Sequence, residues 1–373
     1  MLEPRISKYL HAKATRENIP INGTFELTAR CNFNCPMCYV HLSAEEQRRR
    51  GRELTGDEWI DIAEQAKKAG TVFLLLTGGE PTVHPEFVKI YEHISRMGFY
   101  TSMNSNGRLL EGELLELFRR NPPQRLNITL YAIDNAGYER QCGVPAYDQV
   151  VRNIRALREA GVFVRVNLTI TPANQAEMEE LVAKGKELGA VIMGTTYLWP
   201  QIRVDANAVG QSFRPSPEEA GRAMAVYDSL RMPHEAFLAR CRGFLEGVPQ
   251  QTLSEEDCTI GSRMLCRAGR ATYWIDWQGN MTPCALMPIP ASNVLKRGFN
   301  AAWQELRGAI ENIRLPPECA SCEHRKVCNP CAAKCYTETG SFHTKPDYVC
   351  RYTKAFLEAL REEIAKEETN KAD

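Results

Sequence analysis

The feature that most constrains the fold is a regular alternation of short apolar segments with amphipathic ones over the first 225 residues. The apolar segments include VFLLL at 72–76 and VFVRVNLTI at 162–170, and the stretches between them have apolar residues at helical spacing. Apolar strands that alternate with amphipathic helices predict a parallel sheet covered by helices. Six strand–helix units, with the last helix following Pro217, favour a partial (β/α)6, TIM-like α/β barrel over a closed eight-fold one.

The individual elements follow from this pattern. We expect strands at 23–30, 71–80, 100–107, 125–132, 162–170 and 190–199. We expect helices at 54–70, 86–98, 111–121, 147–161, 175–189 and 218–247. In the first of these helices, Thr55 is the expected N-cap and Gly70 the expected end.

The composition changes near residue 258, where cysteines crowd together and prolines become frequent. The segment DWQGNMTPC predicts a β-hairpin that turns at Gln278–Gly279–Asn280. We expect an amphipathic helix at 351–368 and a disordered end at 369–373. The predicted divisions are an N-terminal extension (1–22), an α/β core (23–235), a helical linker (236–257), a small cysteine-rich domain with the hairpin and short helices (258–352), and a C-terminal helix and tail (353–373).

Charge and hydropathy exclude several classes of protein. Lys and Arg together number 46, as do Asp and Glu, so no global field argues for nucleic acid or an anionic membrane as partner. No stretch of 18 uninterrupted apolar residues occurs, and the first twenty residues lack the apolar core of a secretion signal. We therefore expect a cytoplasmic protein with no membrane and no nucleic-acid partner.

Fourteen cysteines are unusual for such a chain, because a reducing compartment disfavours disulfides. Regularly spaced cysteines there indicate metal. Cys31, Cys35 and Cys38 have the spacing C-x3-C-x2-C, whereas a structural zinc site needs four ligands. Three thiolates would leave one iron of a four-iron cluster uncovered. Either a distant residue fills that position, or the open iron binds a substrate or cofactor.

The segment LTGGEP, which contains Gly78, Gly79 and Glu80, favours the open iron. Glycines allow a close approach of the backbone, and the carboxyl end of a strand in an α/β sheet is where ligands bind. A carboxylate and free carbonyls at that point can hold a ligand's ammonium group. With C-x3-C-x2-C about forty residues earlier, this combination resembles the radical S-adenosylmethionine (SAM) superfamily.

The resemblance implies a function for each matching residue. In that family the open iron of a [4Fe-4S] cluster chelates SAM, and an electron from the cluster yields methionine and a 5'-deoxyadenosyl radical, which abstracts hydrogen from substrate. By resemblance, the cluster ligands are Cys31, Cys35 and Cys38, and the SAM-binding residues are Met37, Gly78, Gly79, Glu80, Asn104, Thr129 and Asn167. Asn106 could also line the pocket, and Arg165 could instead bind the SAM carboxylate. Met37 departs from the family, which often has an aromatic residue there.

The C-terminal cysteines resemble the SPASM domain, a radical SAM extension with two auxiliary [4Fe-4S] clusters. The resemblance assigns Cys258, Cys266, Cys284 and Cys331 to the first auxiliary cluster, and Cys319, Cys322, Cys328 and Cys350 to the second. The chain departs from the family pattern at Ala332, so Cys331 and Cys335 both stay candidates. If neither binds, an open iron there could take a substrate thiolate; zinc knuckles are the other alternative. The implied cofactors are SAM and three [4Fe-4S] clusters.

SPASM proteins mostly act on peptides, so the resemblance implies a radical SAM/SPASM oxidoreductase that matures a ribosomal peptide by thioether or carbon–carbon crosslinks. The implied partners are a peptide or protein substrate and an electron donor such as flavodoxin or ferredoxin. About thirty residues before Cys31 are too few for a leader-binding domain, so we expect recognition through a separate leader-binding protein, a short leader, or direct docking on the barrel mouth. There are three alternatives: sulfatase-type maturation, chemistry on a small molecule, and a non-catalytic iron–sulfur carrier. Ala285 disfavours the first, because sulfatase-maturing enzymes carry a carboxylate at that position. Candidate acid–base groups are Glu338, Tyr336, Asp205 and Arg203, whereas Cys142 and Cys241 have no predicted function.

Overall fold

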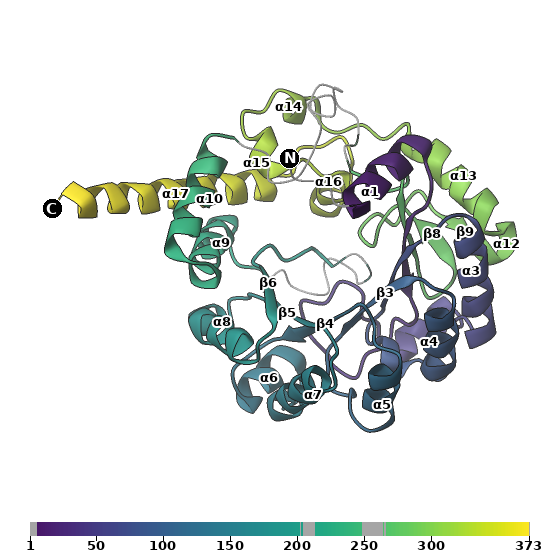
Figure 1. Ribbon diagram of the computed structural model, residues 1–373. Coiled ribbons are helices and arrows are strands. Elements are labelled where there is room, and N and C mark those ends of the chain that lie inside the picture. Colours follow the sequence, from purple (N-terminus) through teal and green to yellow (C-terminus); the bar gives the residue numbers. More distant parts are fainter. Residues whose placement is uncertain (1–5, 202, 204–212, 248–263, 265, 373) are drawn as a thin grey trace.

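The computed structural model describes residues 6–201, 203, 213–247, 264 and 266–372, of which 370–372 are described by their backbone alone. Its central feature is one sheet whose first six strands are parallel and neighbour one another in chain order. These strands are β1 (Asn22–Glu26), β2 (Phe73–Thr77), β3 (Tyr100–Ser105), β4 (Arg125–Leu130), β5 (Val164–Thr169) and β6 (Val191–Thr195). They curve around a common centre with helices outside them (Figure 1), which confirms the predicted partial barrel.

The helices between the strands also confirm the prediction. They are α3 (Gly56–Lys68), α4 (Phe87–Arg96), α5 (Glu113–Arg120), α7 (Tyr147–Glu159), α8 (Met178–Glu187) and α9 (Pro217–Arg231). Thr55 is the N-cap of α3, and its hydroxyl and the Glu58 carboxylate form a reciprocal capping box. The helix expected over 218–247 is divided, because Pro233 separates α9 from α10 (His234–Leu245).

Several short elements were not predicted from the sequence. They are α1 (Ile6–Glu17), α2 (Ala44–Arg50), α6 (Asn135–Cys142) and the 3-10 turns η1 (Pro81–Val83) and η2 (Gln175–Glu177). Among them, α2 begins shortly after the loop that carries Cys31, Cys35 and Cys38, which we call the three-cysteine loop, and α6 ends on Cys142. Both therefore help to define the surroundings of that loop.

The cysteine-rich part adds β7 (Thr272–Ile275), β8 (Asn280–Thr282) and β9 (Ser292–Asn293) to the same sheet. The predicted hairpin is confirmed, with β7 and β8 antiparallel and Gly279 at positive φ in the turn. β7 pairs in parallel with β1, so that Asn22 lies opposite Thr272. The sheet therefore runs continuously from the barrel into the cysteine-rich part, and the proposed domain boundaries stay a prediction.

Five shorter helices and one long helix complete the part of the chain that the structure describes. The shorter ones are α12 (Val294–Arg297), α13 (Phe299–Ile310), α14 (Pro317–Ala320), α15 (Arg325–Cys328) and α16 (Ala332–Thr339), and the long one is α17 (Asp347–Ala372). Phe356 of α17 packs against Phe244 of α10 in a small apolar cluster. The backbone is helical through Ala372, so the expected disorder of the last residues is wrong as far as 372. An ion pair between Lys366 and Glu363, one turn apart, favours the helix there.

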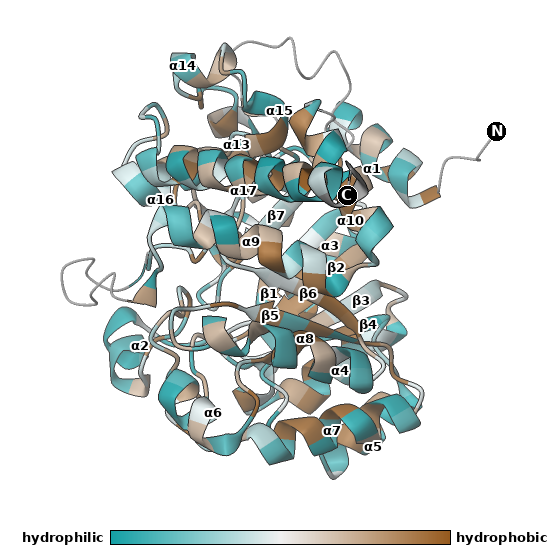
Figure 2. Ribbon diagram, turned by 90° about the vertical axis from the view of Figure 1, so that its left-hand side faces the viewer, coloured by the Kyte–Doolittle hydropathy of each residue, from teal (hydrophilic) through white to brown (hydrophobic). Residues whose placement is uncertain are grey.

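Alternation along the strands separates an apolar face from a polar one. Residues such as Phe25, Leu76 and Ile128 are buried in the main apolar core with the surrounding helices. In Figure 2 the helices alternate brown and teal, as expected for amphipathic helices on a sheet. The alternate strand positions, such as Thr77 and Thr129, line a pocket on the opposite face of the sheet. No helix in the described ranges is long and apolar enough to cross a bilayer.

Candidate radical SAM site

The three cysteines of the N-terminal motif lie around one pocket, in the loop that connects β1 to α2. The pocket is lined by Cys31, Phe33, Cys35, Cys38, Tyr39, Val40, His41, Thr77, Gly78, Gly79, Asn104, Ser105, Asn106, Thr129, Tyr131 and Trp274. Its residues come mainly from the carboxyl ends of β1 to β4, where ligands bind in open α/β sheets. The cavity measures about 160 Å³, so it would enclose only part of a cofactor-sized ligand.

Gly78 and Gly79 are required where the chain after β2 crosses the chain after β1. A Cβ atom on Gly79 would lie 2.3 Å from the Arg30 carbonyl oxygen, and one on Gly78 would lie 2.4 Å from that of Thr28. The Gly79 N–H donates to the Thr28 carbonyl at 2.8 Å. The glycines thus bring the β2 end against the segment that leads into Cys31, in addition to lining the pocket.

Glu80 is fully buried and does not line the pocket. Its carboxylate accepts hydrogen bonds from the Asn106 N–H at 2.7 Å, from the Thr82 hydroxyl at 2.7 Å and from the Ser105 hydroxyl at 3.0 Å. Burial raises the pKa of Glu80, and these donors oppose that rise. In this structure Glu80 therefore fixes the end of β3 against the end of β2.

Polar side chains connect the strands across the interior of the barrel. The Asn106 Nδ2 donates to Asn32 Oδ1 at 2.7 Å and lies 3.5 Å from the Cys31 sulfur. The Asn127 Nδ2 donates to Asn104 Oδ1 at 2.7 Å, and Asn104 Nδ2 lies 3.4 Å from the Thr77 hydroxyl. Asn104 and Asn106 both line the pocket, as expected from the sequence.

Three further predicted SAM residues occupy different positions. Thr129 lines the pocket, whereas Met37 and Asn167 are half-buried outside the set of lining residues. Asn167 lies opposite Thr129 in the parallel pairing of β4 and β5. Its Oδ1 is buried and has no hydrogen-bond partner in the described part of the chain, which leaves an acceptor near the pocket.

Tyr131 is a pocket residue that the sequence analysis did not identify. It follows Thr129 by two positions, so the alternation of the strand could have placed it on the same face. Its ring contacts Phe33 and Tyr138 edge-on. A hydrogen bond between Tyr131 and Cys35 favours the thiolate form of that cysteine.

Cys142 was assigned no function from the sequence, but it lies against the three-cysteine loop. Its carbonyl accepts a hydrogen bond of 2.9 Å from the Asn34 N–H, and its side chain is fully buried. The contact with the Cys142 side chain, together with burial, raises the pKa of Cys35. Burial also raises the pKa of Cys31 to about 12 and that of Cys38 to about 11. Metal binds the thiolate form, so binding here would release protons.

The segment after β6 lies across the three-cysteine loop. The Gln201 Nε2 donates to the Pro36 carbonyl, at 2.5 Å, and to the Cys38 carbonyl, at 3.1 Å. The Arg203 guanidinium donates to the Val40 carbonyl at 3.0 Å and forms a bidentate pair with the buried Glu26 carboxylate. Arg203 is thus already paired, and it fixes the loop to β1.

Trp274 of β7 reaches the same carboxylate. Its indole N–H donates to Glu26 Oε2 at 2.9 Å, and the ring lines the pocket. This residue was not predicted to belong to the site. Its place follows from the parallel pairing of β7 with β1, which brings a residue 248 positions distant beside Glu26.

The C-terminal cysteines fall into two neighbourhoods. Besides burial, the charge of Cys331 raises the pKa of both Cys266, to about 11, and Cys284, to about 12. In the second group, burial and the neighbouring charges of Cys328, Cys350 and Cys322 raise the pKa of Cys319 to about 11. The two predicted sets of ligands stay a prediction. Cys258 lies outside the described residues.

Cys335 lies between the two groups and is buried. Burial and the charges of Cys319, Cys331, Cys328 and Cys350 raise its pKa to about 12. Cys331 is an electrostatic neighbour of Cys266 and Cys284, and also of Cys328 in the second group. The choice between Cys331 and Cys335 stays a prediction.

The candidate acid–base residues are placed as follows. The Glu338 carboxylate forms a bidentate pair with Arg214, in which both side chains are 8% exposed, and it accepts a hydrogen bond from the Tyr197 hydroxyl at 2.5 Å. Tyr336 stacks on Phe342 with ring centroids 4.8 Å apart. Asp205 lies outside the described residues. Glu338 therefore joins α16 to the chain after β6 in this structure.

Within the described ranges, no group of three or more His, Cys, Asp or Glu side chains is arranged to hold a single metal ion. A [4Fe-4S] cluster makes a different demand, since each cysteine binds its own iron. Three thiols around one pocket, with a cysteine-free side formed by Gly78, Gly79 and Asn104, suit such a cluster with one iron left for another ligand.

Comparisons with known proteins identify the family. A model of the Radical SAM superfamily matches residues 25–184. The PqqA peptide cyclase of Streptomyces rochei is 30% identical over 297 residues, which are 77% of this chain and 76% of that protein. The chain belongs to the radical SAM superfamily. Membership implies an enzyme that uses SAM and a [4Fe-4S] cluster.

Other relatives of this radical SAM chain carry different names. The AdoMet-dependent heme synthase of Methanosarcina barkeri is 28% identical over 353 residues, 90% of this chain and 97% of that protein. Among solved structures, Streptococcus suis SuiB bound to S-adenosylmethionine superimposes with a TM-score of 0.67 at 18% identity, over 92% of this chain and 81% of SuiB. Native anSMEcpe with bound AdoMet superimposes with a TM-score of 0.69 at 16% identity, over 94% of this chain and 100% of that chain. The two structures support the radical SAM fold.

Proposed function

We propose that this radical SAM enzyme is an oxidoreductase that abstracts hydrogen from a peptide substrate and matures it, by a thioether or carbon–carbon crosslink. The observation that carries the proposal is the 30% identity to a PqqA peptide cyclase over 77% of the chain. A structure of SuiB bound to its precursor peptide SuiA, with a TM-score of 0.66, gives further support. The peptide would enter at the carboxyl edge of the barrel.

In this proposal Cys31, Cys35 and Cys38 hold the [4Fe-4S] cluster. When bound, the cluster supplies the electron that cleaves SAM to methionine and a 5'-deoxyadenosyl radical. Gly78 and Gly79 offer backbone groups to the SAM ammonium, and Glu80 positions them through Asn106. Asn104, Thr129 and Asn167 offer polar side chains to the other groups of SAM, and Met37 packs near SAM. Arg165, whose Nε has no partner in the described part of the chain, supplies positive charge for the SAM carboxylate.

The two C-terminal cysteine groups would hold auxiliary [4Fe-4S] clusters. The first would use Cys258, Cys266, Cys284 and Cys331, and the second Cys319, Cys322, Cys328 and Cys350. Cys284 and Tyr39, which follows Cys38, pack against the same apolar cluster, which supports a first auxiliary cluster near the three-cysteine loop. An electron donor such as flavodoxin or ferredoxin, a separate leader-binding protein and a cytoplasmic location belong to the same proposal.

A second candidate is radical chemistry on a small molecule, as the name heme synthase indicates for the relative that matches this chain almost from end to end. The two candidates share the cleavage of SAM and differ in the substrate. A peptide encoded by a neighbouring short reading frame should gain a mass change in the first case. A tetrapyrrole should be consumed in the second.

Anaerobic reconstitution with iron, sulfide, dithionite and SAM tests the shared step. We expect 5'-deoxyadenosine from the wild-type chain and from Cys241→Ala, a buried cysteine remote from the pocket, but none from Cys35→Ala. Iron should number about twelve per chain for three clusters, and about four fewer in Cys35→Ala. No 5'-deoxyadenosine above the Cys35→Ala background would show that the proposed chemistry is wrong.

A further inference from the structure

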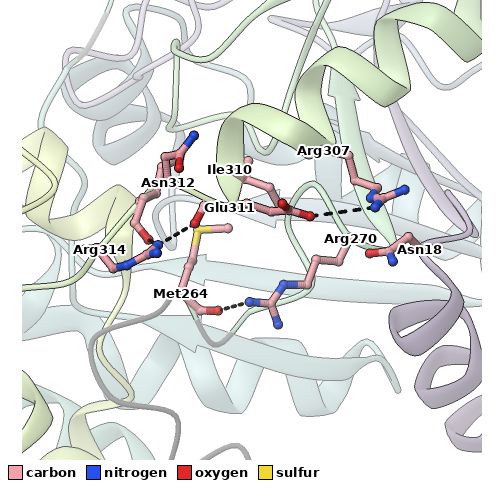
Figure 3. A pocket seen from close by; sticks show the side chains of 9 residues that line it. Asn18, Met264, Arg270, Arg307, Ile310, Glu311, Asn312 and Arg314 are labelled. Carbon is pink, nitrogen blue, oxygen red and sulfur yellow. Dashed lines mark hydrogen bonds and ion pairs between the residues drawn. The ribbon is translucent and has the colours of Figure 1, made fainter.

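A second pocket lies away from the radical SAM site, at the opposite end of β1. It has a volume of about 500 Å³ and is lined by Asn18, Met264, Arg270, Arg307, Ile310, Glu311, Asn312, Ile313 and Arg314. Asn18 and Arg270 precede β1 and β7, whereas the three cysteines follow β1. Figure 3 shows the pocket beneath the end of α13, with the arginines entering from two sides. The volume is within the range of about 300–1,000 Å³ typical of ligand sites.

The charge of this pocket is strongly positive. Among the lining residues that the structure describes, three arginines face one carboxylate, that of Glu311, which gives this set a net charge of plus two. Glu311 lies 3.7 Å from Arg307, and because its side chain is 68% exposed, the surrounding water weakens this ion pair. Because the whole chain is neutral, this concentration of arginine is a local feature.

The end of α13 explains part of the cluster. The Arg314 Nη1 donates to the Glu311 carbonyl at 2.5 Å and to the Ile313 carbonyl at 3.2 Å, as expected for a cation near the carboxyl end of a helix. Arg270 does not belong to that helix, and it donates to the Met264 carbonyl at 2.6 Å. The Arg307 Nη1 donates to Gln304, but its Nε is buried with no partner in the described part of the chain. A guanidinium has five N–H donors, so most of them stay available to a ligand.

We propose that the arginine pocket binds an acidic segment of the peptide substrate, separate from the residue that reacts. Arginines on two elements can bind carboxylates at two or three points, and clusters of this kind recognise acidic motifs. Asn18 and Asn312 add amide groups that can pair with a peptide backbone. The exposed Glu311 and Asn312 leave the rim open, so a chain can enter and leave. A free small anion would use only one of these points.

The position of the pocket suits this function. The strand β1 has five residues and spans about 17 Å, so at least about five extended residues of a peptide must lie between the pocket and the carboxyl edge of the barrel. One peptide could therefore engage both sites. The inference rests on the proposed peptide substrate, but its test does not depend on turnover.

The experiment measures binding of a fluorescein-labelled peptide with four glutamates, and of its four-glutamine version, by anisotropy on the full-length reconstituted protein. The test variant is Arg270→Gln/Arg307→Gln/Arg314→Gln. The matched control, Arg120→Gln/Arg152→Gln/Arg361→Gln, removes the same charge from exposed positions elsewhere. We expect the glutamate peptide to bind the wild-type and the control equally, and the test variant about ten-fold or more weakly, which is 1.4 kcal/mol. Binding should weaken when salt rises from 50 to 200 mM.

Equal binding by the test variant and the wild type would overturn the inference, as would an equal loss in the control variant, which would indicate non-specific attraction. Citrate and inorganic phosphate serve as further probes. If either binds the wild-type pocket while the glutamate peptide does not, the pocket is a small-anion site and the inference is wrong. SAM cleavage without substrate should be the same in all three proteins, so a failure of the proposed chemistry is recognised separately.

Discussion

Asn106 connects the buried Glu80 carboxylate to the sulfur of Cys31. Its N–H donates to Glu80 at 2.7 Å, and its side-chain Nδ2 lies 3.5 Å from the Cys31 sulfur and 2.7 Å from Asn32 Oδ1. Through this residue the ends of β2 and β3 and the three-cysteine loop are held in one arrangement. Glu80 of the TGGEP segment thus does not line the pocket itself, but it positions Asn106, which does.

This connection predicts the effect of Asn106→Ala. We expect the fold to persist and iron to leave the N-terminal centre about five-fold faster or more under a chelator, because a hydrogen bond is worth about 1 kcal/mol. The rate of iron release measures this effect. Asn153→Ala is the control, since Asn153 is also buried and donates to the Gly107 and Arg108 carbonyls without lining the pocket. Equal rates in the two variants would refute the link.

Gly79→Ala should destabilise the protein by about 2–3 kcal/mol or more, because the new methyl group would lie 2.3 Å from the Arg30 carbonyl oxygen. Chemical denaturation measures this loss, and SAM affinity should fall with it. Gly308→Ala is the matched control: it lies within α13, a Cβ there meets nothing within 4 Å, and alanine should add about 0.5–1 kcal/mol. If Gly79→Ala is as stable as the wild type, the close approach of the segments after β1 and β2 does not require glycine at position 79.

Without a cluster, the contact with Cys142 favours the thiol form of Cys35. Once Cys35 binds iron as a thiolate it can only accept, so the Cys142 thiol would donate to it. Cys142→Ala should then lower the midpoint potential of the N-terminal cluster, because hydrogen bonds to the sulfurs help to set that potential. One hydrogen bond of about 1 kcal/mol corresponds to on the order of 40 mV for one electron. A redox titration followed by electron paramagnetic resonance measures the shift. Cys241→Ala, which removes a buried thiol between α10 and α17, should leave the potential unchanged. A potential that is the same in both variants would contradict the contact with Cys35.

Glu338→Gln and Arg214→Met test whether Glu338 stabilises the structure or takes part in catalysis. The pair is bidentate and nearly buried, so loss of Arg214 leaves an uncompensated charge and should cost about 3–5 kcal/mol. If Glu338 is structural, both variants lose stability and keep the turnover of their folded fraction. If it is catalytic, Glu338→Gln loses turnover and Arg214→Met keeps it. Denaturation and single-turnover assays on the same samples separate the two outcomes.

Acid stability should depend on Glu58. Hydrogen bonds from Arg52 and from the Thr55 backbone lower the pKa of Glu58 from 4.5 to about 2. Since the pKa is lower in the folded state, this stabilisation is complete above pH 4.5 and is lost as the pH falls towards 2. Glu58→Gln should therefore cost about 1 kcal/mol at pH 7 and much less near pH 2, as measured by denaturation across that range.

The parallel sheet, the capping of α3, the hairpin and the cysteine motifs could be predicted from the sequence, because periodicity, caps, turns and ligand spacing are local properties. The family resemblance of the local motifs also assigned Gly78, Gly79, Asn104 and Thr129 to the pocket. Three contacts could not be predicted: the pairing of β7 with β1 that brings Trp274 to Glu26, the approach of Cys142 to Cys35, and the ion pair of Arg214 with Glu338. These contacts join residues far apart in the chain, and their partners are chosen by packing, which no local pattern encodes.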